Sequence, residues 1–180
     1  MGTNNGRSAW GFRGMALWLR LRERFRDPEV ELVEIGLGAG QTILDYGCGI
    51  GSYTIPAARI VGRTGATYAL DIHPLAAGTV ERRARSAGLT NLETICSDCD
   101  TGLESGSVDV PLLYDVLHTV KDKARFLREL GRVLKPGGLL AVKPDHMTAD
   151  QLQATMNSGN LFVLRAQRGK LFEFVRQANT

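Results

Sequence analysis

A glycine-rich turn preceded by a carboxylate is the segment of this sequence best suited to bind a ligand. The turn ends a short apolar run that begins at residue 42, and it reads Asp45-Tyr46-Gly47-Cys48-Gly49-Ile50-Gly51. Glycines permit a sharp turn from a strand into a helix, and they let a ligand approach the bare backbone near the free N–H groups of the helix start. We therefore expect a ligand site at this turn.

The spacing of the glycines separates two kinds of cofactor site. A dinucleotide-binding turn has the pattern G-x-G-x-x-G, but here Ser52 occupies the position of the third glycine. Asp45 would also repel a pyrophosphate, whereas it can help to hold a ligand that carries an ammonium group. The sequence therefore disfavours an NAD-type oxidoreductase.

Two further aspartates follow the next two predicted strands. Asp71 ends the strand predicted at 66–70, and Asp98 follows the strand predicted at 91–95. A carboxylate at the first position can accept hydrogen bonds from both hydroxyls of a ribose. At the second position it can accept from an exocyclic amine such as that of adenine. Three acidic residues at successive strands indicate a nucleoside-containing ligand.

The elements that must position these residues alternate regularly along the chain. The apolar periodicity predicts helices over 10–26, 29–35, 52–61, 74–87, 122–134 and 148–157, and strands over 42–46, 66–70, 91–95, 108–114, 138–143, 161–166 and 171–175. Alternating strands and helices predict a parallel sheet covered on both faces. The last two strands predict an antiparallel hairpin. The expected fold class is α/β, a Rossmann-like doubly wound sheet of seven strands. Pro111 predicts a bulge in the fourth strand, because proline removes a ladder donor.

Composition limits the class of protein. The chain has 180 residues, 22 Lys and Arg against 19 Asp and Glu, a net charge of +3 and 43% apolar residues, which is consistent with one globular domain. No apolar run approaches the roughly 18 residues of a membrane span. Three cysteines and the lack of a signal-peptide pattern lead us to expect a reducing, cytoplasmic setting. No nucleic-acid partner is expected, and the oligomeric state cannot be derived.

The ordered motifs together resemble the class I S-adenosylmethionine-dependent methyltransferases, within them the small-molecule group (type 11) related to ubiquinone and menaquinone biosynthesis enzymes. The matching segments are 33–40, 43–51, 68–74, 91–100, 107–118 and the phrase Arg132-Val133-Leu134-Lys135-Pro136-Gly137-Gly138. The resemblance implies methyl transfer from S-adenosylmethionine to a small-molecule acceptor, with S-adenosylhomocysteine as the product.

The resemblance also implies roles for individual residues of the cofactor site. Gly47, Gly49 and Gly51 would line the methionine part of the cofactor, with Asp45, Tyr46 and Cys48 in the same turn. Asp71 would bind the ribose hydroxyls, and Ile72 would pack against the adenine. Asp98 would accept from the adenine amine, and the backbone of Cys99 would meet a ring nitrogen. Tyr114 would border the methyl-transfer site.

Three polar residues are candidates for a catalytic role at the acceptor. Asp115 and His118 follow the fourth strand, and His146 follows the fifth. Histidine can act as a base near neutral pH, although a base is needed only where the acceptor must lose a proton. The alternatives are a non-catalytic cofactor-binding or regulatory module and an enzyme that methylates arsenite on Cys48, Cys96 and Cys99. We expect buried neutral thiols instead, and no metal site is predicted.

The chain is expected to divide into an N-terminal helical lid or cap at 1–35 and a methyltransferase domain at 36–180. The lid would use the apolar residues Trp10, Phe12, Met15 and Trp18 to cover the active site. Packing of the same residues against the sheet is the alternative.

Overall fold

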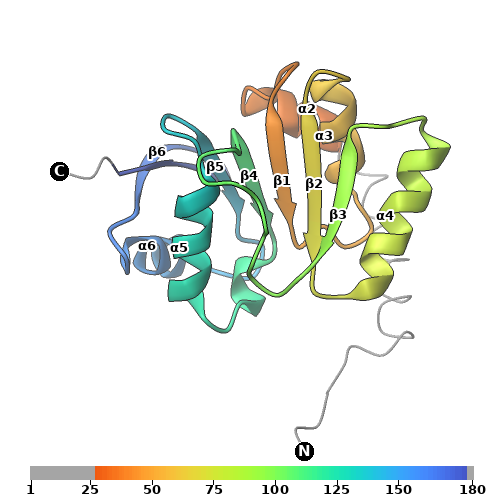
Figure 1. Ribbon diagram of the computed structural model, residues 1–180. Coiled ribbons are helices and arrows are strands. Elements are labelled where there is room, and N and C mark those ends of the chain that lie inside the picture. Colours follow the sequence, from red (N-terminus) through yellow and green to blue (C-terminus); the bar gives the residue numbers. More distant parts are fainter. Residues whose placement is uncertain (1–26, 178–180) are drawn as a thin grey trace, which may run out of the picture.

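A single seven-stranded sheet organises the computed structural model, which describes residues 27–177. The strands are β1 (Thr42–Tyr46), β2 (Ala66–Asp71), β3 (Leu92–Cys96), β4 (Val110–Tyr114), β5 (Leu139–Lys143), β6 (Phe162–Arg168) and β7 (Leu171–Arg176). Their order is β3-β2-β1-β4-β5-β7-β6. The first five strands run parallel, and β7 is antiparallel to both β5 and β6. The predicted α/β fold with its C-terminal hairpin is confirmed (Figure 1).

Helices cover both faces of this sheet (Figure 1). They are α2 (Pro28–Glu34), α3 (Thr54–Val61), α4 (Pro74–Ser86), the 3-10 turn η1 (Leu117–Thr119), α5 (Lys123–Val133) and α6 (Ala149–Asn157). Helices α5 and α6 pack on the face that includes Leu44 and Leu113. Helices α2 and α3 pack on the opposite face, against Ile43 and Leu112. Because neighbouring strand residues point to opposite faces, each central strand contributes to both cores.

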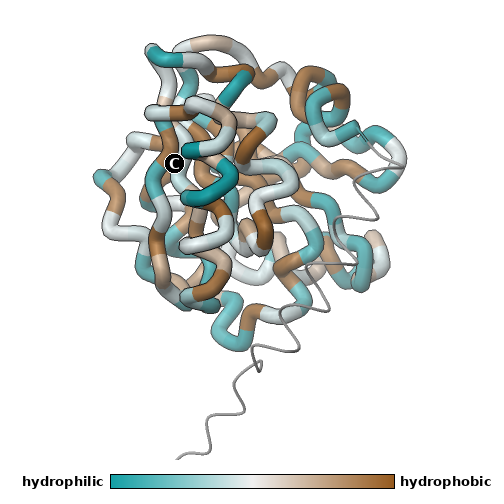
Figure 2. Tube along the Cα trace, turned by 90° about the vertical axis from the view of Figure 1, so that its right-hand side faces the viewer, coloured by the Kyte–Doolittle hydropathy of each residue, from teal (hydrophilic) through white to brown (hydrophobic). Residues whose placement is uncertain are grey.

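Apolar residues concentrate between these layers, whereas hydrophilic residues occupy much of the outer surface (Figure 2). Strands β4 and β5 are buried along their whole length, as expected for parallel strands covered on both faces. None of the described helices is long and apolar enough to cross a membrane.

Capping residues determine where the helices begin. Asp27, His73 and Asp122 each accept a hydrogen bond from a backbone N–H in the first turn of α2, α4 and α5. Thr148 caps α6 and forms a capping box with Gln151. These side chains satisfy N–H groups that have no partner within the helix.

The expected bulge at Pro111 is absent. Pro111 pairs in register with Leu44 of β1, between the pairs made by Val110 and Leu112. Pairing of β4 with β5 begins only at Leu112, so the missing N–H lies near the strand start, where proline is tolerated. The irregularity of the sheet lies instead in β6, between Leu164 and Ala166.

Most expected boundaries agree with the structure within two residues. The helix expected at 10–26, and with it the apolar lid residues, lies outside the described residues. The remainder of the expected cap, α2, packs through Leu32 into the same core as α3.

Candidate active site

The glycine turn joins the end of β1 to the start of α3, at the edge where the parallel strands end. Gly47, Gly49 and Gly51 all have positive φ angles, of 79°, 54° and 82°, which residues other than glycine rarely adopt. The N–H groups of Gly47 and Cys48 both donate to the Leu70 carbonyl, at 2.7 and 3.0 Å. The turn is therefore fastened to the end of β2.

Gly47 is also required for space. A Cβ atom there would lie 2.5 Å from Cγ2 of Val116, in the loop after β4. The turn after β1 and the loop after β4 thus touch at a position that only glycine can occupy without displacement. This contact brings two sets of candidate site residues together.

Asp45 is a buried carboxylate beneath the turn. Its side chain is 3% exposed and accepts a hydrogen bond from the hydroxyl of Thr54, the first residue of α3. Burial raises the pKa of Asp45 to about 6, because removal from water disfavours the charged form. A bound ammonium group would stabilise the charged carboxylate and offset the cost of burying it, so the position suits the amino group of a ligand.

Asp71 connects the end of β2 to the glycine turn. One carboxylate oxygen accepts from the N–H of Gly49 at 3.0 Å, and the other accepts from the N–H of His73 at 2.8 Å. Each oxygen keeps acceptor capacity beyond these bonds. Ile72 and Leu75 follow it as exposed apolar side chains, 57% and 43% exposed, which suits an aromatic base stacked beside the ribose. Leu75 was not identified from the sequence.

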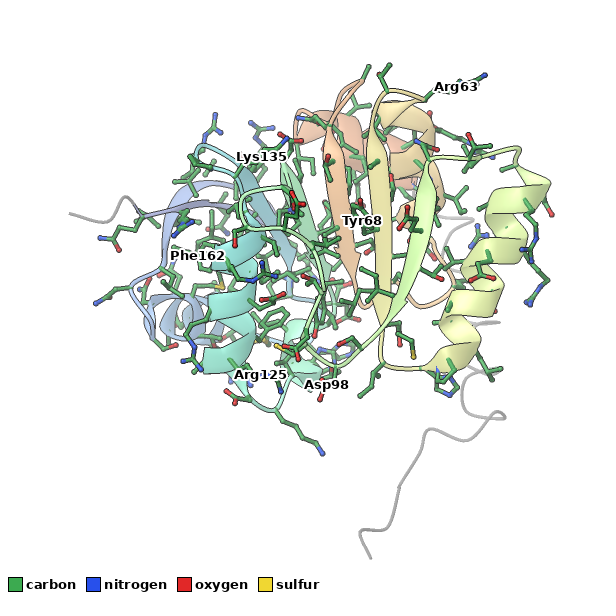
Figure 3. The ribbon with its side chains drawn as sticks, in the orientation of Figure 1. Arg63, Tyr68, Asp98, Arg125, Lys135 and Phe162 are labelled. Atoms are coloured by element: carbon green, nitrogen blue, oxygen red, sulfur yellow. The ribbon has the colours of Figure 1, made fainter. Side chains whose placement is uncertain are left out.

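The loop after β3 is held at the same edge by Tyr46. The phenol of Tyr46 donates to the backbone carbonyl of Asp98, and its ring packs edge-on against Phe126 of α5. Asp98 itself is exposed, and the N–H of Cys99 donates to the Ser97 hydroxyl at 3.3 Å. Figure 3 shows Asp98 beside the beginning of α5, close to Arg125.

Further along, the same loop is anchored to α5 by a carboxylate. Glu129 accepts from both the N–H and the hydroxyl of Thr101 and pairs with Arg132. The Arg132 guanidinium and the Thr101 donors lower the pKa of Glu129 to about 2. The loop that carries Asp98 is therefore fixed at both ends.

Tyr114 ends β4 on the face covered by α2 and α3. Its ring packs edge-on against Tyr53, with centroids 4.4 Å apart. Lys143 of β5 lies beside both rings and pairs with Glu31 of α2, which also accepts from the Tyr53 hydroxyl at 2.9 Å. The Tyr114 hydroxyl is buried and has no hydrogen-bond partner among residues 27–177. No pattern in the sequence predicts this cluster, because its members come from four segments that are far apart in the chain.

The three residues proposed for the acceptor side come together in the structure. Nδ1 of His146 lies 2.6 Å from Oδ1 of Asp115, and Nδ1 of His118 lies 3.6 Å from the same oxygen. The two imidazole rings are 4.7 Å apart between centroids. We call these three residues the Asp115 cluster. It adjoins the glycine turn, because Val116, which follows Asp115, is the residue packed against Gly47.

The cysteines show no comparable arrangement. Cys48 and Cys99 are buried as expected, but Cys96 is exposed, so the expectation of buried thiols is wrong for Cys96. Burial raises the pKa of both Cys48 and Cys99, as expected for neutral thiols. Among the described residues, no group of three possible metal ligands includes a cysteine. Nothing in this part of the chain supports an arsenite site.

Comparison with known proteins assigns the family. Residues 44–142 match the type 11 family model, which is described as a methyltransferase domain, and the chain belongs to this family of class I methyltransferases. It is 33% identical over 109 residues to the ubiquinone/menaquinone biosynthesis C-methyltransferase UbiE of Klebsiella pneumoniae, a match that covers 59% of this chain and 43% of that protein. The chain thus spans less than half the length of the curated relatives it matches.

Two solved structures extend the comparison. A SAM-dependent methyltransferase from Aquifex aeolicus is 27% identical, with a TM-score of 0.73, over 85% of this chain and 89% of that one. A putative S-adenosyl-L-methionine-dependent methyltransferase from Methanococcus maripaludis has a TM-score of 0.82 over 100% of this chain and 98% of that one, at 13% identity. The second likeness shows the fold alone. S-adenosylmethionine is the cofactor of this family, and the residues described above fit it.

Proposed function

We propose that this protein transfers a methyl group from S-adenosylmethionine to a small-molecule acceptor. The observation that carries the proposal is the pair of carboxylates, Asp45 and Asp71, at a glycine turn in which position 47 has no room for a Cβ atom. The cofactor supplies an activated methyl group on a positively charged sulfur.

The residues of the turn would divide the recognition of the cofactor between them. Asp45 would attract the ammonium group of the methionine part, and the backbone from Gly47 to Gly51 would line that part closely. Asp71 is held from both sides by N–H donors, so its orientation is fixed before a ribose binds. Preorganisation of this kind reduces the cost of ordering side chains on binding.

The adenine would lie between the exposed side chain of Ile72 and the loop after β3. Asp98 is exposed there and free to accept from the exocyclic amine, while Tyr46 holds the loop through its backbone. Cys99 would contribute its backbone N–H, which now bonds weakly to Ser97 at 3.3 Å. These roles follow the sequence-based expectations and stay predictions.

The acceptor would bind over the ends of β4 and β5, where the Asp115 cluster lies beside the glycine turn. Holding both reactants at near-attack distance can supply roughly 7–11 kcal/mol of the barrier reduction. Tyr114 would border this region from the opposite face of the sheet. A cytoplasmic setting and the apolar N-terminal lid also stay predictions.

The first test is calorimetric titration of the protein with S-adenosylmethionine and S-adenosylhomocysteine. We expect micromolar binding, weakened at least about tenfold in Asp71→Ala, because hydrogen bonds to a charged group contribute about 1.5–3 kcal/mol. Asp150→Ala, which removes an exposed carboxylate on α6, is the matched control and should bind like the parent. A folded parent that binds neither ligand would overturn the proposal.

Turnover separates an enzyme from a cofactor-binding module. Release of S-adenosylhomocysteine should be measured with panels of hydroxyl, amine, thiol and activated-carbon acceptors. We expect release that depends on one acceptor class and that falls in Asp71→Ala. Tight cofactor binding without release for any class would favour the non-catalytic alternative.

A further inference from the structure

We propose that Asp115, His118 and His146 form a binding site for one divalent transition-metal ion, at the edge of the sheet beside the cofactor turn. Among the described residues, these three form the group of possible ligand atoms that all lie within 4.8 Å of one another. The proposal departs from the sequence-based expectation that the chain has no metal site.

The distances within the Asp115 cluster suit a single ion. Metal–nitrogen and metal–oxygen bonds of about 2.0–2.1 Å place the ligand atoms of a tetrahedral zinc site about 3.3–3.4 Å apart. The Asp115 oxygen lies 2.6 Å from one imidazole Nδ1 and 3.6 Å from the other. These separations bracket the expected value, and all three ligand atoms lie within 4.8 Å of one another.

The backbone holds Asp115 in an unusual conformation that favours the cluster. Its φ angle is 58°, in the left-handed region that few residues with a Cβ adopt, aspartate more often than most. Its N–H donates to the carbonyl of Lys143 at 2.8 Å, which ties the loop after β4 to the end of β5. The next loop brings His146 to the Asp115 carboxylate. Backbone strain of this kind persists where the surroundings fix it, often at functional sites.

The donor set and exposure indicate the kind of metal. Two imidazole nitrogens and one carboxylate oxygen suit Zn²⁺, Fe²⁺, Co²⁺ or Ni²⁺ rather than Mg²⁺ or Ca²⁺, which prefer all-oxygen sites. The side chains of Asp115, His118 and His146 are 22%, 34% and 61% exposed. Three protein ligands with an open side are typical of metal sites that bind a further ligand from solution.

A hydrogen bond between Asp115 and one histidine explains less of this arrangement than a shared metal ion does. His146 Nδ1 lies within hydrogen-bond distance of Asp115 Oδ1, at 2.6 Å, whereas His118 Nδ1 is 3.6 Å from the same oxygen, too far for a hydrogen bond. His118 nevertheless turns the same ring nitrogen toward the same oxygen and lies against the His146 ring. Convergence of a second imidazole on that point is what a shared ion requires.

The site would select acceptors, and this consequence rests on the proposed function. An ion held here would bind an oxygen or nitrogen donor of the acceptor beside the glycine turn. Coordination lowers the pKa of a hydroxyl bound to the metal, and the released proton would pass to solvent. We therefore expect acceptors with a hydroxyl or amine that can bind a metal, instead of purely apolar ones.

The test is titration of the tag-free full chain with Co²⁺ and with Zn²⁺, in the absence of the cofactor. Cys96→Ser serves as the background, because this exposed thiol would otherwise compete for the ion. We expect one ion per chain and a visible Co²⁺ absorption spectrum. His118→Ala and His146→Ala should each weaken binding by more than about 10–100-fold, the loss that removal of an outer-shell partner already causes.

His73→Ala is the matched control, because His73 is the remaining histidine of the chain and lies outside the cluster. It should bind Co²⁺ like the background protein. The metal site would be overturned if the folded background protein bound neither ion at 100-fold excess, or if both cluster variants bound the ion as tightly as the background protein. Because the titration needs neither cofactor nor acceptor, its failure is distinguishable from failure of the proposed function.

Discussion

The glycine turn and the Asp115 cluster lie at the same edge of one sheet, but different contacts hold them in place. In the turn, each functional carboxylate is fixed by other parts of the fold: Asp45 by Thr54, and Asp71 by the backbone of Gly49 and His73. In the cluster, the two imidazoles interact with the Asp115 carboxylate and with each other.

The two sets of contacts fit the different roles that we propose for the turn and for the cluster. The proposed cofactor side is a rigid surface, whose backbone atoms and buried carboxylate are held in place before any ligand binds. Acceptors vary between enzymes, and the proposed acceptor side consists of exposed side chains on loops, which a stable scaffold allows to change. Substitutions of the turn glycines should therefore damage stability and binding together, whereas substitutions in the cluster should leave stability nearly unchanged.

The largest expected effect is that of Gly47→Ala. Its Cβ would overlap Val116 and would require a φ of 79°, so the overpacking and the left-handed backbone together should cost about 2–5 kcal/mol of unfolding free energy. Cofactor affinity should fall as well, because the turn must shift. Urea denaturation and calorimetry measure the two effects.

Gly36→Ala is the matched control for this variant. Gly36 has a similar φ of 82°, but a Cβ there would meet nothing within 4 Å. We expect it to lose only the backbone contribution, about 1–2 kcal/mol, with cofactor affinity unchanged. Equal losses in the two variants would mean that the Val116 contact does not constrain the turn.

The next effect concerns the buried charge of Asp45. Its pKa rises from 3.8 to about 6 in the folded protein, so between these pH values the folded state holds a proton that the unfolded state has lost. Its contribution to stability therefore falls as pH rises through this window, by about 3 kcal/mol in all. Asp45→Asn should remove this slope and should be no less stable than the parent at pH 7.

The same variant should bind the cofactor more weakly at pH 7, because it lacks the charge that faces the ammonium group. Urea denaturation at pH 4.5 and pH 7, with calorimetry at pH 7, tests both statements. A variant that matched the parent in affinity would remove Asp45 from the proposed site. Asp109→Asn serves as a control for charge removal, because Asp109 pairs with Lys135 away from the turn.

Local patterns in the sequence were enough to predict the glycine turn and the position of Asp71 beside it, whereas the roles of these residues toward the cofactor stay predictions. The glycines, Asp45 and the strand before them are contiguous in the chain. A strand followed by a glycine turn and a helix can therefore be recognised from neighbouring residues alone. Asp71 and Asp98 were located because carboxyl ends of parallel strands meet at one edge. The contact of Gly47 with Val116 was not predicted, because it joins residues far apart in the chain.

The acceptor side was predicted only as separate candidates. Asp115, His118 and His146 were each proposed for a catalytic role, but their convergence depends on the lengths of two loops and on the positive φ of Asp115. Neither the loop geometry nor the positive φ angle of Asp115 can be predicted from the residue types alone. The prediction of a bulge at Pro111 was wrong for a related reason. Whether the missing N–H of proline disrupts the sheet depends on the register of pairing between β4 and β5, which residue types do not reveal.

The smallest effect should come from Tyr114→Phe. The Tyr114 hydroxyl is buried with no hydrogen-bond partner in the described part of the chain, so its removal should leave stability unchanged or raise it by up to about 1 kcal/mol. Tyr46→Phe makes the same chemical change where the hydroxyl donates to Asp98, and it should cost about 0.5–1.5 kcal/mol. Thermal denaturation of both variants measures the contrast. If Tyr114→Phe lost as much stability as Tyr46→Phe, the hydroxyl would have a partner beyond residues 27–177; if it lost only turnover, Tyr114 would act at the acceptor.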